Sequence, residues 1–191
     1  MRLDQASYAA IDFESAGSAP GLTDSPVQIA IARMDGFTPL PAEALRSYLR
    51  AGRPITWSAQ QVHGIQAADL RDAPPLTELW PRIQSLLRGR LLVAHSASTE
   101  RRFLRAFPTH RFGPWIDTLH LARKLHPELG SHRLGDLVAH FQLEPTLAPL
   151  CPGLAWHDAL YDATASLVLL RHLVQSAGWS HLSPDLLLSG K

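Results

Sequence analysis

Hydrophobic residues along the chain follow two spacings, and the first is typical of β-strands. Short apolar or alternating runs, rich in Ile, Val, Ala and Leu, are set off by polar or turn residues such as Asp35-Gly36. One of these runs, 44–50, fits a helix as well as a strand. Together they predict strands over residues 7–13, 26–36, 44–50, 91–95 and 115–117.

The second spacing, three to four residues between apolar positions, is typical of amphipathic helices. It is clearest at 76–89, where Pro81 favours a start near Trp80. Ser98 is the expected N-cap of the next helix. The same spacing recurs further along, and helices are predicted over residues 76–89, 98–107, 118–126, 133–141 and 158–175.

The order of these elements predicts the class of fold. Strands come first, and strands and helices then alternate, which indicates an α/β or α+β sheet covered by helices with an antiparallel meander at its start. A chain of 191 residues usually forms one domain. We therefore expect a single domain over 1–178, followed by a C-terminal tail over 179–191.

Composition narrows the class of protein. The chain is 46% hydrophobic and 18% charged, which is ordinary for a globular protein. Cys151 is its only cysteine, so an internal disulfide and a thiolate zinc cluster are excluded. No apolar run approaches the roughly 20 residues of a membrane span, and the first residues do not resemble a signal peptide. We expect a cytoplasmic protein with no membrane partner.

Charge is unevenly distributed. Residues 1–45 contain two basic and six acidic residues, whereas residues 98–135 contain seven basic and three acidic ones. An acidic part facing a basic part suits a metal site beside a polyanion, although a solvated surface explains the same charges.

Two carboxylates end the first predicted strand. Side chains alternate along a strand, so Asp12 and Glu14 point to the same side. Burying two like charges side by side is costly, and a divalent cation is a compact counter-charge. Alternatively the strand ends at Ile11 and both acids are solvated.

Other acidic residues lie far along the chain. Glu100 falls in the first turn of a predicted helix, where it could simply complement the helix dipole. His157 and Asp162 lie five residues apart and converge only if His157 precedes the helix that Asp158 caps. Alternatively, these are a capping residue and an exposed one.

These residues occur in an order that resembles a known family. "IDFESAG", "LLVAHSASTERRFL" and "HDALYDA" are similar to the three motifs of the DEDDh 3′–5′ exonucleases, of which the epsilon subunit of bacterial DNA polymerase III is a member. The resemblance covers about residues 6–175. It implies a ribonuclease H-like α/β fold, with a mixed five-stranded sheet flanked by helices.

The resemblance also implies a two-metal-ion hydrolysis of phosphodiester bonds. Two divalent ions, Mg²⁺ or Mn²⁺, would be held by carboxylates. Asp12 would contact both ions, Glu14 and Asp162 would complete the first, and Glu100 would reach the second. His157 would take a proton from the attacking water.

The resemblance further implies a substrate, single-stranded DNA or RNA with a free 3′ end. The motifs do not distinguish the two. The tail does not resemble a clamp-binding segment, so a polymerase or clamp partner has no support in it. The residues expected to contact nucleic acid are Ser15, Ala16, Gly17, His95 and Arg101.

Several positions depart from the usual motifs. Glu100 stands where the family usually has Asp, Ser96 replaces Asn, and Thr99 replaces Phe. Ser15-Ala16 replaces Thr-Thr or Thr-Ser. Because all five acidic or basic groups remain, we expect an active 3′–5′ exonuclease. The alternative is an activity-impaired module that binds nucleic acid or a polymerase partner.

Overall fold

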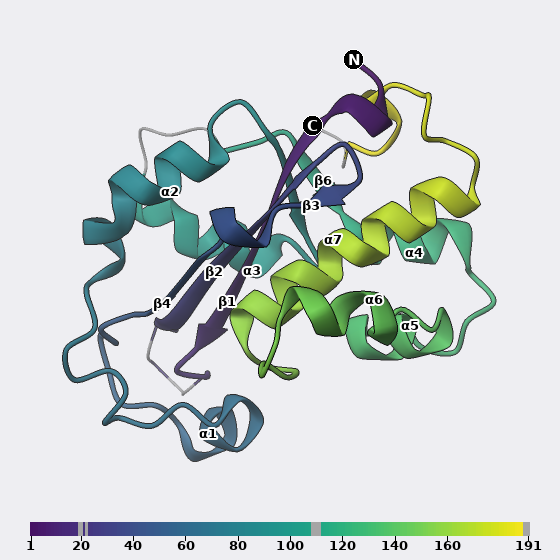
Figure 1. Ribbon diagram of the computed structural model, residues 1–191. Coiled ribbons are helices and arrows are strands. Elements are labelled where there is room, and N and C mark those ends of the chain that lie inside the picture. Colours follow the sequence, from purple (N-terminus) through teal and green to yellow (C-terminus); the bar gives the residue numbers. More distant parts are fainter. Residues whose placement is uncertain (19–20, 22, 108–111, 189–191) are drawn as a thin grey trace.

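The computed structural model describes residues 1–18, 21, 23–107 and 112–188, and a mixed sheet lies at its centre (Figure 1). The strands are β1 (Ser7–Ser15), β2 (Pro26–Asp35), β3 (Thr38–Pro39), β4 (Leu45–Tyr48), β5 (Leu91–Ala94) and β6 (Trp115–Asp117). Their order is β3-β2-β1-β5-β6, and β4 pairs with β2. β1 runs antiparallel to β2 and parallel to β5, which is itself parallel to β6.

The fold class is confirmed, but the expected count of five strands is wrong. The sixth strand, β3, is only two residues long and pairs with the end of β2. Gly36 makes the turn between them, with a φ of 56°. Two residues are too few to produce a periodic pattern, so no sequence signal marks this strand.

Helices cover both faces of the sheet. α7 (Ala159–Ser176) crosses one face of the sheet together with α4, α5 and α6, and α2 and α3 cover the other face (Figure 1). The α1 helix stands beyond the end of β1 (Figure 1). The remaining bounds are α1 (Trp57–His63), α2 (Trp80–Leu87), α3 (Ser98–Phe103), α4 (Thr118–Leu125), α5 (Leu134–His140) and α6 (Glu144–Leu147).

The residues of β1 divide between two hydrophobic cores. Tyr8 and Ala10 pack in the core on the α7 side, whereas Ile11 and Phe13 pack in the core formed with α2 and α3. This alternation continues along the strand, so that Asp12 follows Ala10 on the α7 side. The acid pair therefore faces the helix that carries Asp162.

The structure settles several local predictions. Segment 44–50 contains a strand, and α2 begins at Trp80, after a 3-10 turn. The expected N-cap of α3 is wrong, because Ala97 occupies that position and makes no side-chain cap. Instead, the carboxylate of Asp117 accepts hydrogen bonds from the backbone amides of Ser96 and Ala97.

Residues 179–188 belong to the segment expected to form a C-terminal tail, and they pack against the N-terminus. The amide of Leu3 donates to the carbonyl of Leu182, and that of Asp4 donates to the carbonyl of Ser180. Leu187 is buried in the core on the α7 side. None of the helices in the described part combines the length and the hydrophobicity of a membrane span.

Candidate metal and nucleic-acid site

The first part of the site lies at the C-terminal end of β1. Asp12 pairs with Ala30 of β2, and the register shifts between Glu14 and Ser15. Such a bulge ends regular pairing and bends the strand. The pairing therefore shifts directly after the two acids, and the strand ends at Ser15.

The N-terminus of α7 supplies the second part. Asp158 caps the helix, since its carboxylate accepts from the amide of Leu160, and Asp162 falls in the first turn. His157 precedes the cap with a φ of 67°, a left-handed conformation. Metal-ligating atoms of Glu14, His157 and Asp162 all lie within 4.8 Å of one another.

Side chains from two strands hold this helix end in place. The guanidinium of Arg46, on β4, donates from Nε and Nη2 to the carboxylate of Asp158, at 2.8 and 2.5 Å to Oδ2. Gln28, on β2, donates to Asp158 at 3.1 Å and accepts from the amide of Ala159 at 2.9 Å. Although burial opposes it, hydrogen bonds from Arg46 and Gln28 lower the pKa of Asp158.

Sequence reasoning missed Gln28 and Arg46. Gln28 is almost fully buried, and it is the one amide side chain in the apolar run of β2. A buried amide in such a run needs a hydrogen-bond partner, so the presence of Gln28 in this strand was the signal that could have predicted a polar contact. The local sequence could not identify the partner, because Asp158 lies 130 residues further along the chain.

The third part of the site is Glu100, on α3. It is buried, with 4% of its surface exposed. Its Oε2 atom and the Oδ1 atom of Asp162 are buried without a hydrogen-bond partner among the described residues. Buried polar atoms are normally paired, so both oxygens point to a missing counter-charge.

Burial, together with neighbouring carboxylates, raises the pKa values of the four acids. Desolvation raises the pKa of Asp12, and the charges of Asp162, Glu14 and Glu100 raise it further. Desolvation also raises the pKa of Glu14 to about 8, with Asp162 contributing, and raises the pKa values of Asp162 and Glu100 to about 7. All four acids therefore lie in one electrostatic cluster around Asp12.

This donor set fits a divalent cation. Carboxylate oxygens are the ligands that hard divalent cations prefer, and a cation would remove the repulsion that raises these pKa values. Glu14, His157 and Asp162 can offer ligand atoms to one ion together. Asp12 and Glu100 belong to the same electrostatic cluster, and the unpartnered oxygen of Glu100 is a further possible donor.

The loop after β1 is held by its own backbone. The amide of Ala16 donates to Ser25, and its carbonyl accepts from Thr56, both at 2.8 Å. The amide of Gly17 donates to the hydroxyl of Ser15 at 3.3 Å. A Cβ at Gly17 would lie 2.3 Å from Oγ1 of Thr56, so only glycine fits there. The amides of Ala16 and Gly17 are thus engaged within the protein.

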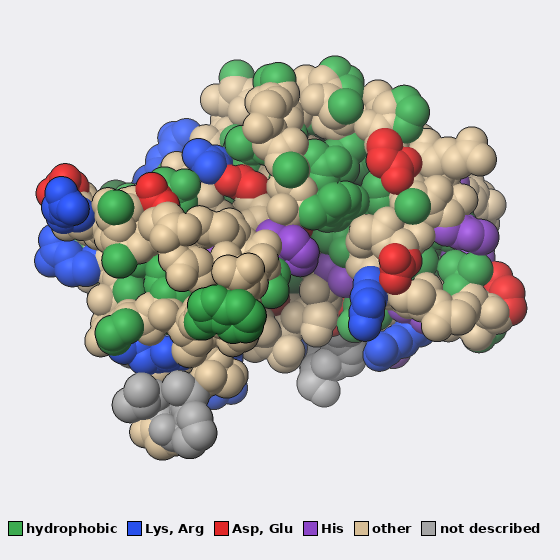
Figure 2. All heavy atoms as spheres, turned by 90° about the horizontal axis from the view of Figure 1, so that it is seen from below, with side chains coloured by type: hydrophobic (Ala, Val, Ile, Leu, Met, Phe, Trp, Pro, Cys, Tyr) green, Lys and Arg blue, Asp and Glu red, His purple; other side chains and the backbone are tan. Residues whose placement is uncertain are grey.

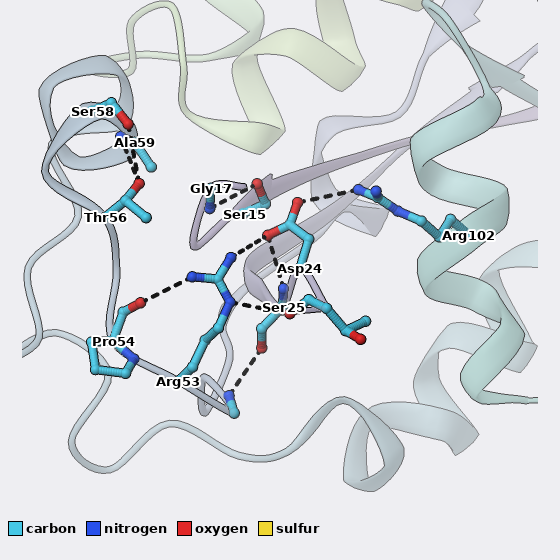
Figure 3. A network of polar contacts seen from close by, with 12 residues as sticks. Ser15, Gly17, Asp24, Ser25, Arg53, Pro54, Thr56, Ser58, Ala59 and Arg102 are labelled. Atoms are coloured by element: carbon cyan, nitrogen blue, oxygen red, sulfur yellow. Dashed lines mark hydrogen bonds and ion pairs between the residues drawn. The ribbon is translucent and has the colours of Figure 1, made fainter. Parts of the chain in front are cut away.

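Asp24 ties this loop to its surroundings (Figure 3). Its carboxylate accepts from Arg53 and from Arg102, both at 3.2 Å. Arg102 belongs to α3, so the ion pair links the helix of Glu100 to the β1–β2 connection. Arg101, which we expected at the substrate, lies over the ring of Trp115 at 5.5 Å.

His95 faces away from the acidic cluster and into the loop before α5. Its Nδ1 lies 2.9 Å from Oγ1 of Thr118, and its Nε2 donates to the carbonyl of His132 at 2.9 Å. Burial lowers the pKa of the His95 imidazole. The side chain therefore holds a loop beside the site.

This chain is similar in sequence to exonucleases and to DNA polymerases, and in fold to exonucleases. A family model described as exonuclease matches residues 9–170. DNA polymerase III of the PolC type from Streptococcus pyogenes serotype M2 is 31% identical over 192 residues, covering 98% of this chain. The chain spans only about 12% of that relative's length.

Solved structures agree with this result. Exonuclease X in complex with 5′ overhanging duplex DNA is 27% identical, with a TM-score of 0.78, and the match covers 95% of this chain and 97% of the other. The nuclease domain of 3′hExo, a DEDDh family member bound to rAMP, is 12% identical with a TM-score of 0.74, and the match covers 98% of both chains. The second likeness concerns the fold alone.

Proposed function

We propose that this chain, which belongs to the exonuclease family of the DnaQ-like 3′–5′ type, removes nucleotides one at a time from the 3′ end of DNA or RNA. The bond broken is the terminal phosphodiester, and the products are a nucleoside 5′-monophosphate and a chain shortened by one residue. The candidate substrates are single strands and, by likeness to the complex of exonuclease X, duplexes whose 5′ end overhangs.

One observation carries this proposal. Two carboxylates from distant parts of the chain, Glu100 and Asp162, each bury an oxygen without a partner among the described residues, beside Asp12. A structural role would not require such a costly arrangement, since buried acids are normally paired. A site that holds cations between the protein and a phosphate does require it.

The residues present would divide the work between them. Asp12, Glu14, Glu100 and Asp162 would hold two divalent ions, Mg²⁺ or Mn²⁺. When bound, such ions activate water and neutralise the charge on the phosphate and the leaving 3′-oxygen. His157 is exposed next to Glu14 and Asp162, so its ring can accept a proton from water at the reacting phosphate.

The direct test is digestion of 5′-labelled oligonucleotides with Mg²⁺ or Mn²⁺. We expect a ladder that shortens from the 3′ end, and no cleavage in the presence of a chelator. Matched DNA and RNA oligomers, single-stranded and with recessed 3′ ends, give the preferred substrate. An oligomer blocked by a 3′-phosphate serves as the control for direction.

Asp12→Asn provides the matched negative protein, because it removes the charge at the centre of the cluster and leaves the size of the side chain. Wild-type protein that binds the oligonucleotide but never shortens it with either metal would contradict the proposal. That result would favour a binding module instead.

A further inference from the structure

A second hollow adjoins the acidic site. The site itself opens into a cavity of about 450 Å³, whose walls include Trp156, His157, Asp162 and Arg133. A neighbouring cavity of about 630 Å³ is lined by His95, Arg123 and His132 together with Arg133. Arg133 and Asp136 line both, so the two cavities meet at these residues. An extended ligand could therefore reach from one into the other.

Figure 2 shows the face of the molecule on the side of α1, α5 and α6 in Figure 1. Histidine side chains lie at its centre, and basic side chains lie beside acidic ones to the right of them, over the part formed by α5 and α6 in Figure 1.

Two arginines in the second cavity are not used within the described part of the protein. Arg123 and Arg133 are exposed, and neither has an ion pair or a side-chain hydrogen bond among the described residues. Arg102, by contrast, is tied to Asp24, and Arg101 lies over Trp115. Arg101 and Arg102, next to the second motif, therefore already make contacts within the protein. Arg123 and Arg133 have no such partner among the described residues and can bind a ligand.

The other polar groups of this cavity are either engaged or neutral. The carboxylate of Asp136 accepts a hydrogen bond from the hydroxyl of Ser131. Burial, and to a smaller extent the charge of Arg123, lower the pKa of His95, so its ring is neutral near pH 7. The two positive charges of the guanidinium groups thus outnumber the single negative charge of the carboxylate, so the cavity favours an anion.

The wall of the cavity is also preorganised. His95 donates from Nε2 to the carbonyl of His132, and His132 donates from its own Nε2 to the carbonyl of His126, at 2.9 and 2.8 Å. These bonds fix the segment 126–132 against the end of β5. A fixed wall places the arginines without the entropy cost of ordering a loop on binding.

We propose that the cavity of Arg123 and Arg133 binds a backbone phosphate of the polynucleotide whose terminal phosphodiester lies at Asp12 and His157. This inference rests on the proposed nuclease function and adds a phosphate subsite outside the reacting centre. Guanidinium groups bind phosphate through two parallel hydrogen bonds, which makes arginine suited to this role. Such contacts position a strand without reading its sequence.

The test compares Arg123→Gln, Arg133→Gln and the double variant with the wild-type protein on two kinds of substrate. The first is a 20-residue oligonucleotide, as a single strand and as a duplex with a recessed 3′ end. The second is the p-nitrophenyl ester of thymidine 5′-monophosphate, which has no further backbone phosphate. Arg82→Gln, an exposed arginine on α2, is the control.

We expect the double variant to raise KM for the oligonucleotide about tenfold. Arg123→Gln, at a residue that lines only the second cavity, should raise KM in part and leave the rate on the nucleotide ester unchanged. The dependence of KM on salt should weaken as well, because about 0.7 counterions are released per phosphate contact on a single strand. Arg123→Lys and Arg133→Lys should recover part of the affinity. If KM rises for both the single strand and the duplex, the subsite binds the cleaved strand. If KM rises for the duplex alone, it binds the complementary strand.

An unchanged KM on both oligonucleotides, or an equal loss on the nucleotide ester, would overturn the subsite. Failure of the wild-type protein to hydrolyse either kind of substrate would instead count against the nuclease function itself. The two outcomes are therefore separate.

Discussion

Asp162 and Glu100 reach the same cluster of acids, but from elements that are held in different ways. Asp162 lies on a helix of 18 residues, whose first turn is capped by Asp158 and fixed to two strands by Arg46 and Gln28. Glu100 lies on a helix of six residues that has no side-chain cap and passes directly into a 3-10 turn. It is supported by the carboxylate of Asp117, which holds the turn before it, and by the ion pair of the exposed Arg102 with Asp24.

The difference explains where the sequence departs from the family motifs. Three of the departures, Ser96, Thr99 and Glu100, lie on the less constrained side, and the motif at α7 keeps both His157 and Asp162. A short helix can shift by a fraction of an ångström to accommodate a side chain that is one methylene longer. A capped and clamped helix cannot, so on that side the spacing between ligand and strand is fixed by the fold.

The strongest test of this comparison is to neutralise each acid in turn. We expect Asp162→Asn to lower kcat by roughly 1,000-fold or more, because the amide keeps the shape but removes a charge that fixes a cation. Glu78→Gln, on the surface, should leave activity unchanged. Steady-state kinetics on a labelled oligonucleotide with saturating Mg²⁺ measure both. A variant as active as the wild type would remove Asp162 from the site.

Glu100 should respond in a graded way. Glu100→Gln is expected to lower kcat by roughly 100-fold, whereas Glu100→Asp should keep or raise activity, since the flexible side of the site can adapt to either acid. Mg²⁺ requires near-ideal geometry, so Mn²⁺ should help the native protein more than it helps Glu100→Asp. The measurement is the ratio of rates with the two metals. A severe loss in Glu100→Asp would show that this side is as fixed as α7.

The same comparison shows how far the sequence could lead. The alternation of β1 predicted that Asp12 and Glu14 face one way, and the capping rule predicted that Asp158 would begin the last helix, with His157 just before it. Both features depend only on residues that are neighbours in the sequence, so a local pattern can predict them. The two-residue β3 lies below the length at which periodicity is recognisable, and the α1 helix buries none of its residues, so no apolar face marks it in the sequence.

The contacts that hold the site are of another kind. Arg46 reaches Asp158 across 112 residues of sequence, and Asp117 reaches Ser96 across 21. Neither pair repeats with a period or adjoins a turn signal, so only the folded chain brings them together. The same applies to Arg123 and Arg133, because only the folded chain places both in one cavity and puts Arg133 in the wall of the cavity of His157 as well.

The clamp on α7 gives a third, smaller effect. Arg46→Ala removes the ion pair with Asp158 and leaves the helix cap in place, so the helix end should loosen without unfolding. We expect kcat to fall roughly 30-fold, because small displacements of catalytic groups are costly, with KM nearly unchanged. The loss of stability should stay within about 1 kcal/mol, as is usual for exposed ion pairs.

Arg46→Lys should restore part of kcat, and Asp158→Asn should mimic Arg46→Ala, since the amide still caps the helix but no longer pairs with a guanidinium. Combining Arg46→Ala with Asp158→Asn should then add little. Additive losses in the double variant would show that the two residues act separately, and that α7 is held no more firmly than α3.

The smallest effect concerns stability without a divalent ion. The pKa values of Glu14, Asp162 and Glu100 are raised to about 8, 7 and 7, so the folded protein holds protons that the unfolded chain releases near pH 4. Stability gained in this way is complete below pH 4 and is lost as the pH rises to about 8. We expect the free energy of unfolding, measured by denaturant titration with chelator, to fall by at least about 1 kcal/mol between pH 5.5 and 8.5, because each group that keeps its proton in the folded protein contributes up to about 1.4 kcal/mol per pH unit.

The two sides of the site should separate in this measurement as well. The charge of Asp162 raises the pKa of both Asp12 and Glu14, whereas the charge of Glu100 contributes only to that of Asp12. Asp162→Asn should therefore flatten the decline with pH more than Glu100→Gln does. An equal flattening of this decline in the two variants would mean that Asp162 and Glu100 interact equally strongly with the other acids. The contrast between a fixed and an adaptable side would then depend only on how firmly the two helices are held.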